Sequence, residues 1–372
     1  MSEKTSSVHY VNYLQLDKIL DAQHLISDKK EGAAHEEMLF IIIHQTYELW
    51  FKQILHEIGS AMDLFQKDKI DESSVGVVVR RMDRVNKIMT ILVGQLDILE
   101  TMTSLDFLDF RDHLSPASGF QSHQFRKLEV ILGLKIKQRH QLGGCPYHSQ
   151  FEGEKKEEIL NLEESKSLLT LVEKWLERIP FLNMEGFDFS KKYEGAVNEM
   201  LEKEIAGIKS ANLTEQDKAL RIRMIDENRK YFERVLDENE HNKAMQERET
   251  ALSYKATMSA LLINLYRDEP ILHLPYQLLR SLVEMDHKIA TWRFRHVQMV
   301  EKMLGQKIGT GGSSGQGYLK QTVDKHKLFT DLANISTLMI SRSYLPELPQ
   351  NIKQTLGFNY KKNRINEFGS KK

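Results

Sequence analysis

Two histidines lie where the helical spacing of the sequence would surround an imidazole with apolar side chains. His296 shares a predicted helical face with Ile289, Trp292, Met299, Val300 and Met303. His44 lies on the same side of its predicted helix as Phe40, Ile41 and Phe51. A single histidine on such a face is more often a hydrogen-bonded core residue than a ligand. Two of them favour a metal site, because helical folds can hold haem by one imidazole with a second polar group over the open iron position.

A second metal site is conceivable from spacing. Glu238 and His241, and also Glu284 and His287, have the Glu-x-x-His spacing of di-iron carboxylate bundles. The first pair lies in a stretch, residues 237–249, that is almost wholly polar and would not form the dry interior of a bundle. We therefore treat the di-iron site as the minor alternative.

Arg111 follows Phe107 and Phe110 and precedes a Ser-Pro turn. An arginine in such a place most often forms a surface ion pair, here with Asp109 or Asp112. The alternative is a bidentate clamp on a carboxylate, since a planar guanidinium in a partly apolar pocket fixes both the position and the angle of that group.

The run from Gly309 to Gly315 contains four glycines in seven residues. It does not match a phosphate-binding loop, because no Lys-Ser/Thr pair follows a glycine at the required offset, and it follows a predicted helix instead of a strand. The run is therefore either a flexible connection between helices or a loop that folds over a substrate.

The elements that must position these residues are predicted to be helices. Apolar residues recur at intervals of three and four over long stretches, and the seven prolines cluster near the expected ends of elements. The predicted helices cover about residues 34–65, 77–101, 157–178 and 276–304. We expect an all-α fold with one helical domain over residues 1–372, carrying a charged helical excursion at about 193–255 and a flexible tail at about 354–372.

Composition excludes several classes of protein. The 52 basic and 53 acidic side chains give a net charge of −1, so nothing attracts nucleic acid or a membrane surface globally. The longest apolar stretch, residues 38–43, is far shorter than the roughly 20 residues that span a bilayer. One cysteine, Cys145, excludes an internal disulfide or a thiolate cage, so a metal would need nitrogen or oxygen ligands. We expect a cytoplasmic protein.

Four ordered segments carry a family resemblance. They are YVNYLQLDKIL at 10–20, HEEMLFIIIHQTYELWFKQILHE at 35–57, FRDHLSPASGFQS at 110–122 and WRFRHVQMVEKMLGQKIGTGGSSG at 292–315. Together they resemble the tryptophan 2,3-dioxygenase family over about Tyr10 to Pro349. The resemblance implies a haem-dependent enzyme that opens the indole C2–C3 bond of L-tryptophan with O2 to give N-formyl-L-kynurenine, with one haem b per subunit.

The resemblance also implies roles for particular residues. His296 would be the proximal ligand of the haem iron, and His44 would accept a hydrogen bond from the indole N–H on the distal side. Arg111 would bind the substrate carboxylate. The remaining contacts would come from Phe40 and Phe107 against the indole, Ser118 near the distal pocket, and Thr310 at the ammonium and carboxylate end.

The family is a homotetramer in which the first helix of one subunit reaches into a neighbouring site. Tyr10, Tyr13 and Leu14 would thus complete the indole pocket of another copy. Two departures are visible: Phe107 stands where some members carry tyrosine, and Lys320 stands where arginine is commoner. Neither position is an expected iron or carboxylate contact.

Three other functions remain open at this point. A dioxygenase acting more broadly on indoleamines would also turn over tryptamine. A haem or tryptophan sensor would bind both ligands without releasing product, and a helical scaffold protein would bind no haem.

Overall fold

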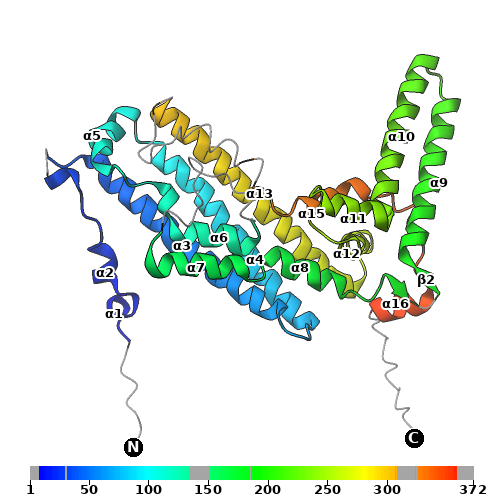
Figure 1. Ribbon diagram of the computed structural model, residues 1–372, viewed down its shortest axis with the longest axis horizontal. Coiled ribbons are helices and arrows are strands. Elements are labelled where there is room, and N and C mark those ends of the chain that lie inside the picture. The colour runs from blue at the N-terminus through cyan, green and yellow to red at the C-terminus, as the bar shows by residue number, and fades with distance from the viewer. Residues whose placement is uncertain are drawn as a thin grey trace, which may run out of the picture. The chain divides into compact units, whose positions relative to one another are not determined.

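The computed structural model describes residues 8–29, 32–134, 151–184, 186–305 and 326–357, together with 307 and 323. Over this part of the chain the regular structure is helical apart from one β-hairpin with two residues in each strand, which confirms the all-α prediction (Figure 1). Thr310, Lys320, Cys145 and most of the predicted tail lie outside the described residues.

Two compact units are distinguished by their internal contacts. The first comprises residues 1–66, 80–170 and 284–328, and the second comprises 67–79, 171–283 and 329–372. Two long helices, α4 (Glu72–Leu99) and α13 (Pro270–Leu304), contribute residues to both units. The prediction of a single domain is not tested by this division and stays a prediction.

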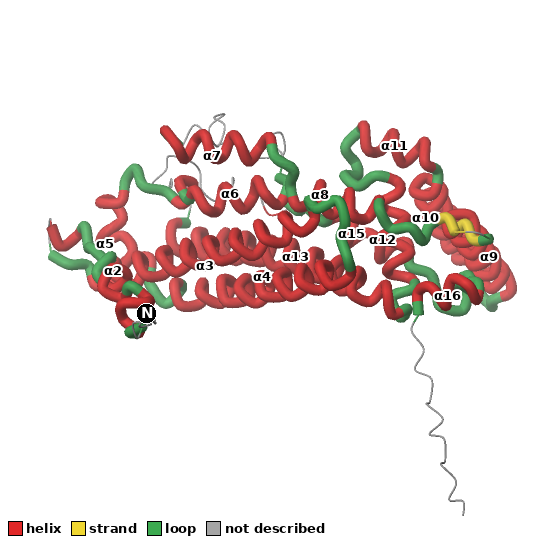
Figure 2. Tube along the Cα trace, turned by 90° about the horizontal axis from the view of Figure 1, so that it is seen from below, coloured by secondary structure: helices red, strands yellow, loops and turns green. Residues whose placement is uncertain are grey.

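The first unit is layered. Its long helices are α3 (His35–Phe65) and most of α4, joined by the end of α13, and its shorter helices are α1 (Tyr10–Leu14), α2 (Leu16–Leu20), α5 (Ser104–Leu114), α6 (His123–Leu132) and α7 (Gly153–Glu164). The 3₁₀ turns η1 (Ser27–Lys29) and η2 (Gly119–Gln121) also belong to it. Figure 2 shows α7 lying over α6, and α6 over the layer of α3, α4 and α13.

Two hydrogen bonds join α3 to α4 at separate points along the pair. The Tyr47 hydroxyl of α3 donates to the Leu92 carbonyl of α4 at 2.7 Å, and Glu57 accepts from Arg84 at 2.7 Å. The buried apolar residues of α3 include Ile54 and Ile58, which are 1% and 0% exposed. Burial of this helical stripe stabilises α3 far more than its intrinsic helix propensity does.

The second unit contains α8 (Leu168–Glu177) in large part, the hairpin β1 (Asn183–Met184) and β2 (Phe187–Asp188), and six further helical segments. These are α9 (Phe189–Ser210), α10 (Glu215–Leu236), α11 (Glu238–Gln246), α12 (Tyr254–Leu265), α15 (Thr330–Asn334) with η5 (Ile335–Leu338), and α16 (Gln350–Leu356). In the hairpin Asn183 pairs with Asp188. The stretch predicted as a charged excursion is helical, and Leu220 and Met224 on α10 are 60% and 58% exposed.

Three of the four predicted helices have other bounds than predicted, and the one predicted over 77–101 is α4, which spans Glu72–Leu99. The helix predicted over 157–178 is two helices, because the chain turns extended at Ser165, whose hydroxyl donates to the Leu162 carbonyl at 2.8 Å. The helix predicted from residue 276 begins at Pro270, a favourable first helical position, and runs through Pro275. The burial of Leu272 and Leu278 offsets the hydrogen bond that Pro275 cannot make.

Among the described residues, no single helix combines the length and apolar character that a membrane span needs. The pair α4 and α5, bent by 104°, satisfies those two criteria only when taken together.

The N-terminal segment is attached to α3 through a buried carboxylate. Glu37, 1% exposed, accepts hydrogen bonds from the Ile26 amide at 2.8 Å, the Ser27 amide at 3.0 Å and the Ser27 hydroxyl. Burial by itself raises the pKa of the Glu37 carboxyl, but these hydrogen bonds outweigh it and hold the pKa below its ordinary value. The ionised carboxylate thus stabilises this attachment.

We predict that Glu37→Gln loosens residues 8–29, because the neutral amide cannot accept as strongly and its NH₂ faces donors. The expected loss is about 1–3 kcal/mol of local stability. Limited proteolysis within residues 8–29 measures it, and Glu36→Gln, at a half-buried neighbouring position, is the matched control.

The same attachment should depend on pH. Because the pKa of Glu37 is lower in the folded protein than in the unfolded chain, the stabilisation is complete above the unfolded value near 4.5 and is lost as pH falls through the folded value. Proteolysis by an acid-active protease should therefore accelerate below that pH in the native protein, while Glu37→Gln should lack this dependence. An equal acceleration in both would contradict the assignment.

Candidate functional site

His44 presents an unprotonated nitrogen away from its own helix. Its Nδ1 lies 2.7 Å from the Phe40 carbonyl oxygen one turn earlier, and since a carbonyl only accepts, Nδ1 carries the proton. Nε2 therefore carries the lone pair. Burial lowers the pKa of His44 although its ring retains accessible surface, while the Phe40 carbonyl and Glu48 act in the opposite direction. His44 is a neutral hydrogen-bond acceptor at neutral pH.

His296 lies on α13 and is also held neutral. Burial, and then the proximity of His44, lowers the pKa of the His296 imidazole to about 4. His44 is close enough to His296 that protonation of one ring would disfavour protonation of the other. The structure thus brings the two predicted histidines together from two helices. Its ring stacks on Trp292, with centroids 5.6 Å apart and planes inclined by 11°. A neutral imidazole has the free lone pair that a metal ligand needs.

An aromatic contact sets the spacing of the two helices. Trp292 lies edge-on to Tyr47 and Phe51 of α3, with centroids 6.0 Å and 6.2 Å away. Figure 1 shows α3 and α13 running antiparallel. His44 is one turn before Tyr47, and His296 is one turn after Trp292, so both histidines lie on the same side of this contact.

Helix α5 brings a second group of aromatic rings to His44. Phe40 lies 4.1 Å from the His44 ring, 5.8 Å from Phe107 and 5.5 Å from Phe110, measured between centroids. The helix begins at a capping box formed by Thr103 and Asp106. The structure thus groups Phe40, Phe107 and His44, as the resemblance implied.

Arg111 is on the last turn of α5, and its side chain is 17% exposed. Its guanidinium lies 3.7 Å from Asp112, whose side chain is 89% exposed. A pair this long and this solvated contributes little to stability. The ion pair with Asp112 is therefore present but weak, and the carboxylate clamp stays a prediction.

Ser118 has a visible local role. It is the N-cap of η2, and its hydroxyl accepts from the Phe120 amide at 3.4 Å. Among the described residues, no hydrogen bond joins Ser118 to His44 or His296.

Glu48, one turn after His44, was missed by the sequence analysis. It accepts hydrogen bonds from the Ser122 hydroxyl at 2.6 Å and, at its backbone carbonyl, from Gln124 at 2.7 Å. These hydrogen bonds connect the start of α6 to α3 one turn from His44. Glu48 lies in the HQTYELW segment of residues 44–50. The residues to which it is hydrogen-bonded, at the start of α6, are about 75 positions later in the sequence, so spacing alone could not pair them.

The N-terminal residues are not part of this group of rings. Tyr10, Tyr13 and Leu14 are 70%, 72% and 36% exposed, and α1 buries no residue. Gln23 and Gln45 join the segment to α3 through a 2.6 Å hydrogen bond. The proposed contribution of the segment to another copy is not tested here.

The di-iron alternative fails. His241 is 4% exposed and its Nε2 faces the Leu252 carbonyl at 2.9 Å, while Glu284 pairs with Lys288 at 2.8 Å. In the described ranges, no three histidine, cysteine or acidic side chains gather in a way that could hold a metal ion. A single imidazole ligand to a haem does not require such a cluster.

Comparison with known proteins gives a consistent result. Residues 1–339 match the family model described as tryptophan 2,3-dioxygenase. Similar proteins named tryptophan 2,3-dioxygenase include one from Bdellovibrio bacteriovorus, 46% identical over 96% of this chain and 100% of its own length. Another, from Dictyostelium discoideum, is 47% identical over 94% and 88%, and one from Mus musculus is 45% identical over 91% and 84%.

We predict that Tyr47→Phe lowers the free energy of unfolding by about 1 kcal/mol, because it removes a buried hydrogen bond to Leu92 while keeping the ring against Trp292. Urea denaturation of the two proteins measures the difference. Tyr231→Phe changes an exposed phenol and serves as the control. Equal losses in both variants would mean that the Tyr47 hydroxyl contributes nothing specific.

Proposed function

The chain belongs to the tryptophan 2,3-dioxygenase family, and we propose that it performs the family's reaction at the His44 and His296 pair with a haem group held by His296. The protein is an oxidoreductase that cleaves the indole ring of L-tryptophan with O2, the first step of tryptophan catabolism through N-formyl-L-kynurenine. The observation that supports the site assignment is that His44 of α3 is close enough to His296 of α13 to lower the pKa of its imidazole, with the Phe40 ring packed against His44.

The residues present fit a haem group. His296 is kept unprotonated and its ring orientation is limited by Trp292, as is needed of the residue that would hold the haem iron. His44 lies near enough to influence its charge, which is the relation expected of a distal group. Bound ferrous haem supplies the activation of O2 that a closed-shell indole needs.

The chain's own residues orient the substrate. The His44 Nε2 lone pair accepts the indole N–H, and Phe40 and Phe107 lie where the flat face of the indole would pack. Arg111 binds the carboxylate through its guanidinium fork, which fixes the amino acid end. An indole N–H is so weakly acidic that His44 serves as an orienting acceptor and not as a base.

The remaining elements of the proposal rest on the family alone. Ser118 and Thr310 complete the polar end of the pocket, and Tyr10, Tyr13 and Leu14 complete the indole pocket of a neighbouring copy in a homotetramer. The high exposure of those three side chains supports this, because apolar and aromatic surface of this kind is normally covered. The low cysteine content supports a cytoplasmic location.

The direct test is the visible spectrum of the haem-supplemented protein before and after reduction, followed by L-tryptophan in air. We expect a Soret band and growth of near-ultraviolet absorbance from a formylated aryl ketone. His296→Ala should lose the native axial ligation. A Soret band without product would indicate a sensor, turnover of tryptamine would indicate a broader indoleamine dioxygenase, and no band would leave a scaffold protein.

For His44→Ala we predict that the turnover rate falls by about a hundredfold without being abolished, because the indole is still bound but less well oriented. Steady-state rates measure this. A tryptophan methylated at the indole nitrogen is the matched probe: the native protein should discriminate against it, and the variant should discriminate less. Complete inactivity with normal haem and tryptophan binding would require a larger role for His44.

For Arg111→Lys we predict weaker tryptophan binding by about 2 kcal/mol, on the order of thirtyfold, because the charge remains but the two parallel hydrogen bonds are lost. Tryptophan titration of the haem spectrum measures it. Arg342→Lys, which alters an exposed pair with Asp268, is the control. Unchanged affinity in Arg111→Lys would remove this residue from the site.

A further inference from the structure

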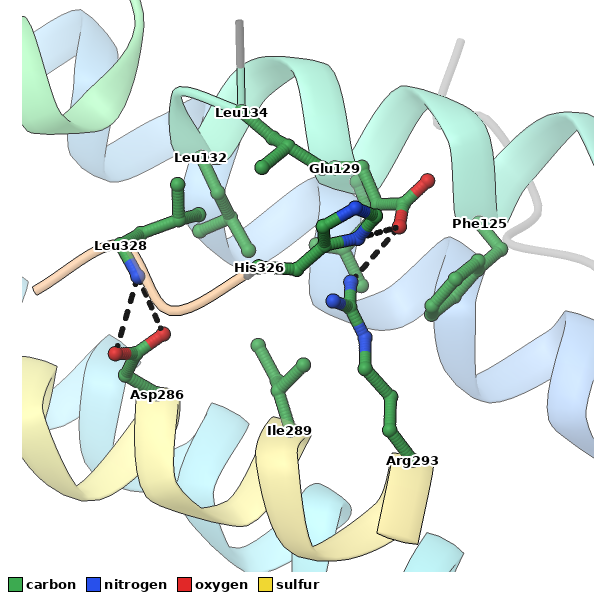
Figure 3. Close-up of a pocket in the computed structure, with 10 residues that line it drawn as sticks. Phe125, Glu129, Leu132, Leu134, Asp286, Ile289, Arg293, His326 and Leu328 are labelled. Atoms are coloured by element: carbon green, nitrogen blue, oxygen red, sulfur yellow. Dashed lines mark hydrogen bonds and ion pairs between the residues drawn. The ribbon is translucent and has the colours of Figure 1, made fainter. Parts of the chain in front are cut away.

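A buried network of charged side chains lies between α6 and α13 (Figure 3). Its Arg293 is one helical turn before His296 on α13. Glu129 of α6 is 4% exposed and accepts from Arg126 at 2.6 Å and from Arg293 of α13 at 2.8 Å. His326 Nδ1 lies 3.5 Å from the same carboxylate. Asp286 of α13 accepts the Leu328 amide at 3.0 Å and 3.1 Å.

The carboxylate at the centre of this network, that of Glu129, is ionised. Burial raises the pKa of Glu129, but Arg126, His326 and Arg293 outweigh it and hold the pKa at about 2, so this carboxylate is ionised. Burial lowers the pKa of His326, which leaves it neutral. The Glu129 carboxylate therefore faces two guanidinium groups. The adjoining cavity of about 10 Å³ has room for roughly one water, so these groups rely on one another and not on solvent.

Two consecutive residues of α13, Trp292 and Arg293, contact side chains of α6. Phe125, one turn before Glu129, has its ring centroid 5.1 Å from that of Trp292 and 5.8 Å from the guanidinium carbon of Arg293. Trp292 is thus held by its aromatic ring, and Arg293 by both the Phe125 face and the Glu129 carboxylate. Figure 3 shows the Arg293 side chain reaching from α13 toward Glu129 beside the Phe125 ring.

Both of these residues are neighbours of His296 on the helix surface. Arg293 precedes it by three positions and Trp292 by four, which places them one turn away on the same face. Trp292 stacks directly on the imidazole. A rotation of α13 that redirected His296 would have to break the Glu129–Arg293 ion pair and move the Trp292 ring from Phe125.

We propose that Glu129 and Arg293 are positioning residues that fix the rotation of α13 and thereby the direction of the His296 imidazole toward the iron. This inference rests on the proposed function, in which His296 is the proximal ligand. The ion pair acts through Trp292 and the helix backbone, and it contacts neither haem nor substrate.

Arg295 offers a matched comparison on the same helix. It lies one residue before His296 and makes ion pairs with Asp97 on α4 at 2.7 Å and with Glu100, the residue after α4, at 3.2 Å. Its side chain is 31% exposed, whereas that of Arg293 is 8% exposed. Arg295→Met removes an ion pair close to His296 without disturbing the packing of Trp292 against α6.

The experiment compares three variants, Arg293→Met, Arg293→Lys and Arg295→Met, with the native full-length protein. Each is used in the oligomeric state in which it is purified and is loaded with haem to full occupancy. Resonance Raman spectra of the ferrous proteins report the iron–histidine stretching frequency, and transfer of haem to an excess of apomyoglobin reports the dissociation rate. We expect Arg293→Met to lower the frequency and to release haem about tenfold faster, as loss of support for a metal ligand does elsewhere. Arg293→Lys should recover part of both, and Arg295→Met should change neither.

An iron–histidine frequency that is the same in Arg293→Met, Arg295→Met and the native protein would overturn the inference, since a purely structural ion pair would leave ligand direction unchanged. If Arg293→Met does not fold, Arg293→Lys and Phe125→Leu carry the same test, with the same expected direction. Failure of the proposed function looks different: the native protein itself would show no iron–histidine band.

Discussion

The contact of Trp292 with Tyr47 and Phe51 is the constraint on which the site depends. It fixes the distance between α3 and α13, and the helical repeat then places His44 and His296 beyond it on one side. The Tyr47 hydroxyl extends the constraint to α4. Since interiors are closely packed, a change in any of these rings would move both imidazoles and not only the nearer one.

Much of the first unit could be predicted from sequence because its helices have strong periodicity. The bounds of α3 agree to within a residue, and the apolar surroundings of His44 and His296 were visible in the spacing. The break at Ser165 was missed because the apolar repeat continues across it, and the start of α13 was missed because Pro275 was taken as a boundary. In both cases local hydrogen bonding or tertiary burial decided against the simple pattern.

Pairings between distant residues could not be predicted at all. Glu48 with Ser122, and Glu129 with Arg293, join residues that are 74 and 164 positions apart, and nothing in either segment marks its partner. The names of the substrate and cofactor likewise came from family resemblance, because two histidines and an arginine at these spacings suit many ligands. What the structure adds is the proximity of the two rings, because His44 is close enough to His296 to lower the pKa of the His296 imidazole.

The Glu37 anchor has a consequence for assembly. Each chain holds the base of its N-terminal segment to α3, while the tyrosines at its tip stay exposed. An arm fixed at its base has already lost part of its conformational entropy before it meets another copy, so less would be lost on docking in the homotetramer proposed above. In that assembly, formation of the oligomer and completion of the indole pocket would be one cooperative event, so dilution would remove both together.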